Sequence, residues 1–531
     1  MKKVVIIGAI LVLAAMANAV TVNHADTGQT IVDGTGVTII PVNEVVASHM
    51  TGNVKISDSP DNDMQPTISR DPNGRIIVAY ATQHSIIDQD LSIMYSSDGS
   101  TWTRAAQMIS TEGGILQYPA IVGIPDAGDV GLGFMDPLTE YPLVLYRMTD
   151  ITDTETYTGV AYSWGETEDY EEVAVTSISY LFVTLFTNHN LYMYDLEGCP
   201  YLAYWTQELD GPPEIGGNYF DGQSILKTAP ASNIDMATGQ DYFYLLMEHY
   251  NETTGHSEIA FKKSVTDLDL LFTSGGGPGG MDKYADIEAM PWQRYLAKGD
   301  FDAQDPNVAA SGNNVAVVYM TNDNIYGDWN VECWYSSDNG ETWSVSTPGG
   351  TPQVDETSPA VFMSGNDVYC VYEKAGNLYL TKSEDGGATW NEPEQINEVD
   401  GTVVSAPRAI AISDGGIVWT DTRDGNMDIY YSPLPMAILS IDITGGFGVK
   451  ATVTNTGTAA GENIAWSVDL SGLVFLGGHS EGTIASLAPG ASETVGPGLV
   501  LGIGPTTITA TAGGATKTAS GFVLGPMVLG L

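Results

Sequence analysis

Three segments of this chain repeat one short pattern, in which a serine, an aspartate, a glycine and a tryptophan keep nearly constant spacing. Residues 336–343 and 383–390 both read Ser-x-Asp-x-Gly-x-Thr-Trp, and residues 96–102 are one residue shorter. The aspartate can accept hydrogen bonds from the N–H groups of a turn, the glycine can adopt positive φ, and the tryptophan can fold back over neighbouring strands. The pattern predicts tight turns between antiparallel strands, which we call the aspartate turns. Their defining residues are Ser96, Asp98, Gly99, Trp102, Ser336, Asp338, Gly340, Trp343, Ser383, Asp385, Gly387 and Trp390.

The chain around these turns repeats as well, with a period of about fifty residues. Each repeat begins at a strand-leading proline, and these are Pro66, Pro119, Pro306, Pro359 and Pro407. A turn follows, then a β-branched or aromatic strand such as 368–372, then a third strand such as 378–381. The aspartate turn leads into a fourth strand. Four strands per repeat predict an all-β fold whose large domain is a β-propeller.

The number of repeats and the way the ring closes follow from the same pattern. The pattern is weak between Pro119 and Pro306, where blades are expected around residues 182–204 and 234–272. Seven blades are predicted, with six as the alternative. The last repeat lacks an outer strand after Tyr431, whereas residues 53–57 resemble a fourth strand. We therefore predict that an N-terminal strand completes the last blade and removes an open sheet edge.

The two ends of the chain differ from the repeats. Residues 1–19 combine two lysines, an apolar run and Ala17-Asn18-Ala19, which is typical of a cleavable secretory signal. We expect a secreted or cell-surface protein with no membrane span after cleavage, an N-terminal segment over 20–52 and a propeller over 53–435. From Met436 onward, short strands rich in Gly, Ala, Thr and Val predict a β-sandwich over 436–531. Residues 453–457 and 487–490 resemble immunoglobulin-like accessory modules of surface proteins.

Acidic residues dominate the composition. The net charge is −47, from 19 basic and 66 acidic residues, and only two of the basic and five of the acidic residues follow Pro435. Such a surface repels nucleic-acid phosphates and attracts cations, either in a salty medium or as bound calcium. Asp421, Asp424 and Asp428 form one cluster of carboxylates that could hold calcium, and Asp58, Asp61 and Asp63 form another, although neither fits EF-hand spacing.

The aspartate turns resemble the Asp boxes, or bacterial neuraminidase repeats, of the sialidase-like propeller superfamily. That resemblance implies turns on the outer rim and a ligand site in the axial cleft. It also implies an arginine two places before a strand-leading proline, as one of three arginines that clamp a substrate carboxylate. The corresponding residues here are Met64, Gln117, Gln304, Thr357 and Ser405. A sialidase site is therefore unsupported, and Arg408 and Arg70 are the candidate ligand-binding arginines of the cleft.

Three functions are consistent with these features. The first is a propeller that binds an extracellular glycan or protein on its axial face. The second is an extracellular enzyme, either a glycoside hydrolase or a polysaccharide lyase, acting from the same face. The third is a structural component of the cell envelope. We favour binding, because the sialidase arginine motif is missing and the fold alone does not specify an activity.

Overall fold

The computed structural model describes residues 29–33, 36–47, 52–110, 114–137, 143–164, 170–178, 181–188, 199–205, 218–219, 231–251, 254–265, 294–457, 459–513 and 515–531. These residues form strands almost throughout, together with one short 3₁₀ helix, η1 (Thr154–Thr156). The predicted all-β class is confirmed. Nowhere in these ranges is there a helix with the length and apolar character needed to cross a membrane.

Seven antiparallel sheets account for the described strands up to Ser432. Each begins with an inner strand, and the inner strands are β4 (Asn62–Arg70), β8 (Gln117–Ile124), β12 (Tyr170–Ile178), β16 (Ala231–Thr238), β20 (Ala303–Ser311), β24 (Glu356–Ser364) and β28 (Ile410–Ser413). The second strands are β5 (Ile76–Ser85), β9 (Asp129–Met135), β13 (Leu181–Asn188), β17 (Tyr242–Asn251), β21 (Asn314–Thr321), β25 (Asp367–Lys374) and β29 (Gly416–Asp421).

The third strands of the seven sheets are β6 (Asp88–Ser96), β10 (Leu143–Met148), β14 (Cys199–Trp205), β18 (His256–Val265), β22 (Asn330–Ser336), β26 (Asn377–Ser383) and β30 (Asp428–Ser432). The fourth strands are β7 (Trp102–Ser110), β11 (Tyr157–Trp164), β15 (Asn218–Tyr219), β19 (Arg294–Ala297), β23 (Ser344–Ser346), β27 (Glu394–Gln395) and β3 (Val54–Lys55).

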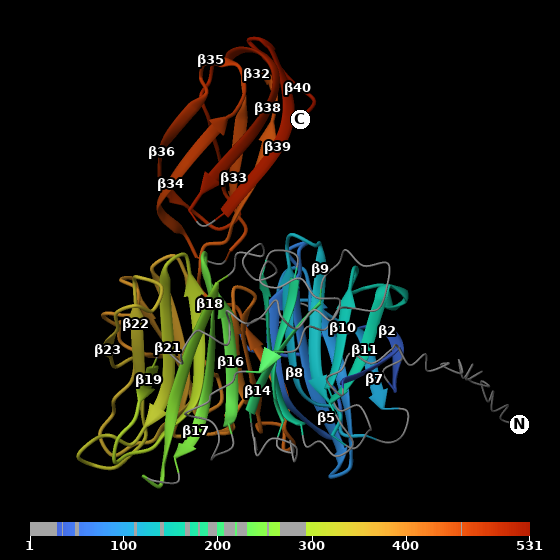
Figure 1. The fold of residues 1–531 in the computed structure, drawn as a ribbon, viewed down its shortest axis with the longest axis vertical. Helices are drawn as coiled ribbons and strands as arrows, with labels where there is room; N and C mark the ends of the chain where they lie inside the picture. The colour runs from blue at the N-terminus through green and yellow to red at the C-terminus, as the bar shows by residue number, and fades with distance from the viewer. Residues whose placement is uncertain are drawn as a thin grey trace, which may run out of the picture.

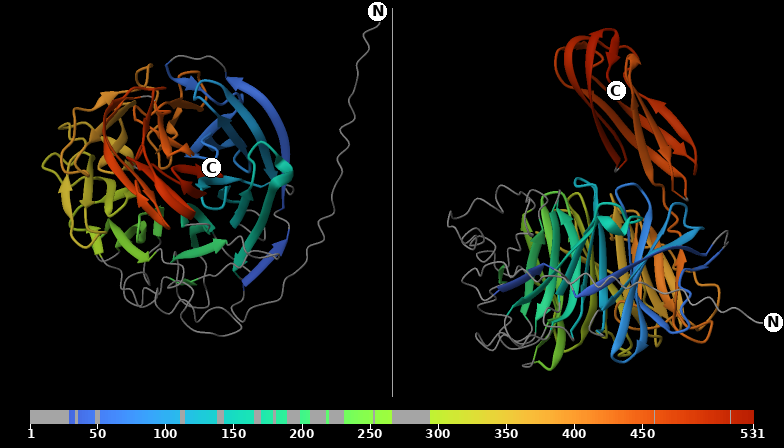
Figure 2. Two further views of the ribbon diagram at one scale, coloured as in Figure 1. Left: turned by 90° about the horizontal axis from the view of Figure 1, so that it is seen from above. Right: turned by 90° about the vertical axis from the view of Figure 1, so that its right-hand side faces the viewer.

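The seven sheets stand around a common axis, as the view along that axis in Figure 2 shows. Each inner strand contacts the inner strand of the next sheet, and β28 contacts β4, so the ring is continuous. Radially arranged four-stranded sheets are the arrangement of a β-propeller. Apolar side chains between neighbouring sheets form the core, and the second strands are buried most completely, as in β9, where every residue is buried.

Ring closure by an N-terminal strand is confirmed. In β3, Val54 pairs with Tyr431 and Lys55 pairs with Tyr430 of β30, so a strand from the start of the chain completes the last sheet. The backbone N–H of Ile56 also donates to the carbonyl of Ile429 at 2.9 Å. This pairing provides partners for the backbone N–H and C=O groups at the edge of the last sheet, which the last repeat would otherwise leave open.

Two further strands precede β3 in the segment where the sequence predicted none. β1 (Gln29–Asp33) pairs with β11, and β2 (Val37–Ala47) pairs with β7, so two adjacent sheets each gain a fifth, outermost strand. β2 is rich in β-branched residues, which favour strands. Pro41 lies beside a register shift at this edge position, where its missing N–H is tolerated.

The aspartate turns join third to fourth strands, as the repeat predicted. In the second turn, Asp338 accepts hydrogen bonds from the N–H of Thr342 at 2.8 Å and from its Oγ1 at 2.7 Å. The Ser336 hydroxyl accepts the N–H of Gly340 at 2.9 Å, and Gly340 has a φ of +78°. The third turn repeats this geometry at Asp385 and Thr389, while in the shorter first turn Asp98 accepts two backbone N–H groups. These residues are therefore turn residues.

The chain after the propeller forms two sheets that share a separate hydrophobic core. One sheet contains β31 (Leu439–Thr444), β33 (Lys450–Asn455) and β37 (Ser492–Val495). The other contains β32 (Gly446–Phe447), β34 (Gly461–Leu470), β35 (Val474–Leu476), β36 (His479–Leu487), β38 (Leu501–Ala512), β39 (Ala515–Gly525) and β40 (Met527–Leu529). We call this part the C-terminal unit, and Figure 1 shows it standing at one end of the propeller.

The C-terminal unit leaves the propeller at the end where the inner strands finish. Ser413, the last residue of β28, pairs with Gly416, and the next residue, Ile417, pairs with Ser432 at the end of β30. Leu434 and Met436 are buried against the last two sheets and fix the start of the unit there. The end of the propeller where the chain enters the inner strands lies on the opposite side.

Candidate functional site

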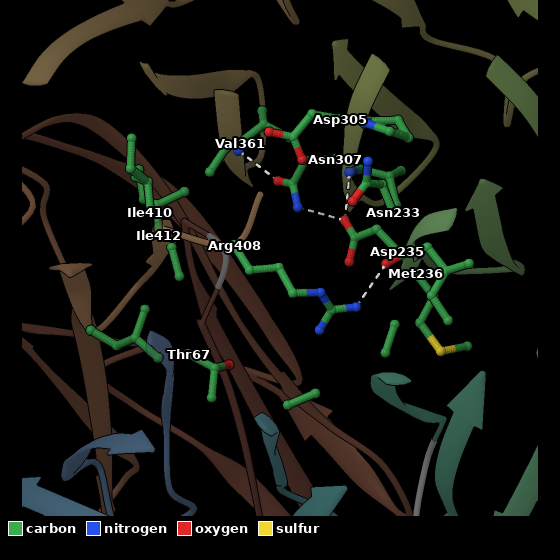
Figure 3. A pocket seen from close by; sticks show the side chains of 18 of the residues that line it. Thr67, Asn233, Asp235, Met236, Asp305, Asn307, Val361, Arg408, Ile410 and Ile412 are labelled. Carbon is green, nitrogen blue, oxygen red and sulfur yellow. Dashed lines mark hydrogen bonds between the residues drawn. The ribbon is translucent and has the colours of Figure 1, made fainter. Parts of the chain in front are cut away.

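A cavity of about 240 Å³ occupies the axis of the propeller. All seven inner regions contribute to its wall, which is made mainly of small or apolar residues such as Pro66, Ala120, Pro306 and Ile410. Its polar side chains come from a few positions only, and Figure 3 shows Arg408 reaching towards the strand that carries Asn233, Asp235 and Met236, with Asp305 and Asn307 on the neighbouring strand. A concave apolar space with a few convergent polar groups is the usual form of a binding site.

The inner strands share an unusual backbone feature beside this cavity. Six non-glycine residues there have φ between +47° and +59°, a left-handed conformation that side chains normally disfavour. They are Gln65, Tyr118, Asn233, Asp305, Ser358 and Arg408. Register shifts next to five of them mark β-bulges in the inner strands, and bulges commonly redirect side chains near functional sites. We call these six residues the left-handed ring.

Hydrogen bonds between neighbouring sheets hold the left-handed ring in place. The N–H of Tyr118 donates to Oε1 of Gln65 at 2.9 Å, and the N–H of Asp305 donates to Oε2 of Glu248 at 3.2 Å. The same Glu248 oxygen accepts from Nδ2 of Asn233 at 2.7 Å. The bonds from Tyr118 to Gln65 and from Asp305 to Glu248 each join one sheet to the next, whereas Asn233 and Glu248 belong to the same sheet. The strained backbone is therefore supported in part by the assembled ring.

A second set of bonds lies deeper along the axis. Oδ2 of Asp235 accepts from the N–H of Val308 at 2.7 Å and from Nδ2 of Asn307 at 2.7 Å. Oδ1 of Asn307 in turn accepts from the N–H of Val361 at 2.7 Å. Asp235 and Asn307 therefore link three consecutive sheets, and part of their hydrogen-bonding capacity is already used in the scaffold.

Arg408 brings the positive charge of the cavity. Its Nη2 donates to the carbonyl of Ile234 at 3.4 Å and lies 3.7 Å from Oε2 of Glu172. Its Cζ is 5.5 Å from the centre of the Tyr118 ring, close enough for a cation–π contact. The side chain is 20% exposed. The guanidinium is therefore oriented by groups from several sheets while it still faces the cavity.

Burial changes the protonation of the carboxyl groups around Arg408. Desolvation, together with the nearby charges of Glu248 and Glu172, raises the pKa of Asp305 to about 7, although Arg408 acts to lower it. Desolvation also raises the pKa of Asp235 to about 6, against the hydrogen bond from Val308. Near neutral pH the two groups can thus either donate or accept a hydrogen bond, which suits recognition of hydroxyl groups.

The predicted site residues separate in space. Arg408 lines the cavity, but Arg70 lies apart from the lining residues, with its Nε 3.3 Å from Asp414 and its Nη2 donating to the Asp414 carbonyl at 2.9 Å. Arg70 therefore bridges the first and last blade-forming repeats. The axial residues Asp235, Asp305 and Asn307 were not predicted.

The carboxylates of the predicted calcium cluster contact protein cations. Asp421 pairs with Arg423, Nη2 to Oδ2, at 2.6 Å, and Asp424 and Asp428 lie 3.0 Å and 2.8 Å from the Lys55 ammonium group. Asp58, in the other cluster, contacts Arg104. Within the described ranges, no three His, Cys, Asp or Glu side chains converge as a metal site would require.

Comparison with known proteins gives no family. No protein-family model and no curated protein matches the chain. Among solved structures it is similar to a protein of unknown function from Dyadobacter fermentans, with 12% identity, a TM-score of 0.41 and coverage of 74% of this chain and 98% of that chain.

Two other similar solved structures are a glycosidase and the propeller domain of a protease. The GH93 α-L-arabinofuranosidase of Fusarium graminearum has 12% identity and a TM-score of 0.37 over 72% of this chain and 97% of that chain. The β-propeller domain of the Trilobed protease from Pyrococcus furiosus has 9% identity and a TM-score of 0.38 over 69% and 92%. Similarities at this level carry no information about activity.

Proposed function

We propose that this chain is an exported, seven-bladed β-propeller that binds a glycan or protein ligand on its axial face. In this proposal residues 53–435 form the propeller, the aspartate turns are Asp boxes on its rim, and residues 436–531 are an immunoglobulin-like β-sandwich. The sandwich attaches at the end of the inner strands, so, in the part of the chain that the structure describes, the opposite end carries no second unit and is the end proposed to meet a ligand.

The observation that carries the proposal is the placement of Arg408. A guanidinium group inside an axial cavity offers fixed donors to hydroxyl, carbonyl or carboxylate oxygens. Pro66, Ala120 and Ile410 supply apolar wall that suits the C–H face of a sugar ring or an apolar side chain. The cavity is small, so it receives a protruding group of a larger ligand.

A second candidate function is glycoside hydrolysis, and it has one observation in its favour. Asp235 and Asp305 line the same cavity with pKa values of about 6 and 7, and a raised pKa is what a catalytic carboxylic acid requires. Asp235 is, however, occupied by the N–H of Val308 and by Asn307. Binding is therefore the better-supported function.

A glycan array, followed by calorimetry on the best hits, tests the proposal. We expect Arg408→Gln to weaken binding at least tenfold, because Arg408 is the only arginine among the described residues that line the cavity. Arg70→Gln is the matched control, since Arg70 lies outside the cavity and its loss should leave affinity unchanged. Both variants need a thermal melt to confirm that they fold.

The same preparations distinguish the other functions. Release of reducing sugar from a bound polysaccharide, abolished in both Asp235→Asn and Asp305→Asn, would establish the enzyme instead. Absence of any glycan or protein ligand, with the cavity intact, would favour a structural role in the cell envelope.

A further inference from the structure

The outer surface of the C-terminal unit carries a concentration of exposed apolar side chains. Among the described residues, 21 large apolar side chains are exposed, and twelve of them lie between Phe447 and Leu531. Single exposed apolar residues are normal on any protein, but a contiguous group marks an interaction site. The nine others are spread over the whole propeller and its N-terminal strands.

Strand pairing places half of the twelve on one face of one sheet. Ile503 of β38 is opposite Leu524 of β39, Leu524 is opposite Met527 of β40, and Met527 is opposite Phe447 of β32. Residues that are directly opposite share a face, as do residues two apart in a strand. We call this group the apolar face, and its members are Phe447, Ile503, Phe522, Leu524, Met527 and Leu529, which are 41–71% exposed.

The apolar face occupies only the far half of its sheet. Further along the same strands the outward positions become polar, with Thr507, Thr509, Thr518 and Ser520 in place of leucine and phenylalanine. The inward positions Ile508, Ala510, Ala512 and Val523 belong to the core of the unit. Figure 1 shows β32, β35 and β40 at the end of the unit farthest from the propeller. The C-terminal unit therefore gathers the six side chains of the apolar face at its distal end.

The patch is large enough for a stable interface. If each of the six side chains of the apolar face, and of the neighbours Leu473, Phe475 and Leu499, presents about 100 Å², they total on the order of 900 Å², whereas the largest patch on a typical monomer is about 300–600 Å² and one partner in a standard interface buries about 800 Å². Phe475 of β35 extends it, together with Leu473 and Leu499 from the neighbouring segments, at 42–75% exposure.

The lack of charged residues around the apolar face indicates which kind of partner fits it. Residues 494–516 and 518–531, which supply most of the patch, contain no Asp, Glu, Lys or Arg, although the whole chain carries −47. Proteins that bind a lipid surface commonly use Lys and Arg beside the apolar residues, and the only such residues after Pro435 are Lys450 and Lys517. A neutral apolar surface is complementary to another neutral apolar surface. The same patch on a second copy meets that requirement.

We infer that two copies of this chain associate through the apolar face, with a two-fold axis at the tip of the C-terminal unit. A two-fold interface needs only a self-complementary patch, and two sheets can pack face to face. Association at the tip keeps the strongly acidic propellers at opposite ends of the pair, where their repulsion is weakest. This inference is independent of any ligand in the axial cavity.

Sedimentation velocity of residues 20–531 over a range of concentrations tests the inference. We expect a monomer–dimer equilibrium that Leu524→Glu shifts at least a hundredfold towards monomer, because it buries a charge at the centre of the interface. Leu524 is 53% exposed, so the substitution should leave the thermal melt of the monomer unchanged. Ile325→Glu, at a 91% exposed position in the propeller, adds the same charge and should leave the dimer intact.

Two further measurements, at high salt concentration and with lipid vesicles, complete the test. Raising the salt concentration should strengthen the dimer, because it screens the acidic propellers and strengthens apolar contacts. A monomer at every concentration would overturn the inference. So would co-sedimentation of a monomer with neutral phosphatidylcholine vesicles that Leu524→Glu abolishes, since that result would assign the apolar face to a membrane.

Discussion

At the scale of single residues, the left-handed ring explains how the cavity obtains its polar groups. Four of its members, Gln65, Tyr118, Asp305 and Ser358, directly precede a strand-leading proline. A left-handed residue costs roughly 1–2 kcal/mol when it is not glycine, yet the bonds between sheets hold it. The strain is thus located where the inner strands turn their side chains towards the axis, which is consistent with a functional role for this rim.

Asp305 should make the stability of the propeller depend on pH. Its folded pKa is about 7, above the ordinary value of 3.8, so between these pH values the folded chain holds a proton that the unfolded chain releases. The stabilisation that this bound proton gives the folded chain is complete below pH ~4, and it is lost as the pH rises towards 7. We expect Asp305→Asn to raise stability at pH 8 by roughly 1–4 kcal/mol and to have little effect at pH 4.

Thermal melts of both proteins from pH 4 to 8 measure this dependence. Asp235 and Asp63 also have raised pKa values, of about 6, so Asp305→Asn should flatten the profile only in part. Parallel pH profiles for the two proteins would contradict the assignment.

The tryptophans of the aspartate turns should contribute unequally to stability. Trp102 is fully buried, donates to the Gly99 carbonyl at 3.0 Å and packs edge-on to Tyr431, with ring centres 4.9 Å apart. Trp390 is only partly buried and donates to the Ser346 hydroxyl. We expect Trp102→Ala to cost about 3–5 kcal/mol and Trp390→Ala about 1 kcal/mol, as measured by urea unfolding. Equal losses of stability in the two variants would mean that the tryptophans stabilise the chain through the turns and not through their burial in the core.

At the scale of elements, ring closure depends on a very short strand with strong side-chain support. The Lys55 ammonium group of β3 contacts Asp428, whose side chain is completely buried, and the half-exposed Asp424. Removing the cation of a buried pair leaves an uncompensated charge. Lys55→Met should therefore destabilise the chain by about 2–4 kcal/mol.

Lys382→Met is the matched control for Lys55→Met. Lys382 also contacts two carboxylates, Asp367 and Glu384, but these are 40% and 70% exposed. Its loss should cost less than about 1 kcal/mol. Limited proteolysis near residues 53–57 should accelerate only in the Lys55 variant; similar rates in both would show that closure does not depend on this ion pair.

The elements that the sequence predicted are those with a repeated pattern. The strand-leading prolines located the inner strands β4, β8, β20 and β24, and the resemblance of residues 53–57 to a fourth strand located β3. β1 and β2 were missed because they occur once each and follow no repeat. Their place on the outside of β11 and β7 is set by edges that only the folded sheets create.

At the scale of the whole molecule, the acidic surface should make stability depend on salt. With a net charge of −47, mutual repulsion opposes the compact state, and ions screen it. We expect the Tm to rise by several degrees between 0.05 and 1 M NaCl. Calcium and magnesium chloride at equal ionic strength should raise it equally; a calcium-specific rise that Asp424→Asn removes would instead establish the predicted calcium site.

The axial site could be predicted only in part. Arg408 was found because it follows a strand-leading proline, which placed it near the axis. Asp235 was missed because its strand has no proline, and Asp305 because it directly precedes Pro306, whereas the sialidase arginine motif concerns the residue two places before each proline. The apolar face was also missed. The alternation of side chains along β38 and β39 shows which residues share a face of the sheet, but it does not show which half of that face is exposed.

The pairing of β3 with β30 also governs the order in which the chain can fold. Val54 and Tyr431 are partners, so a strand near the start of the chain must wait until almost the entire propeller has been synthesised. β1 and β2 wait as well, because their partners β11 and β7 come later. Contacts this distant in sequence slow folding and leave edges open meanwhile. β3, although it is made early, is therefore among the last strands to reach its final place.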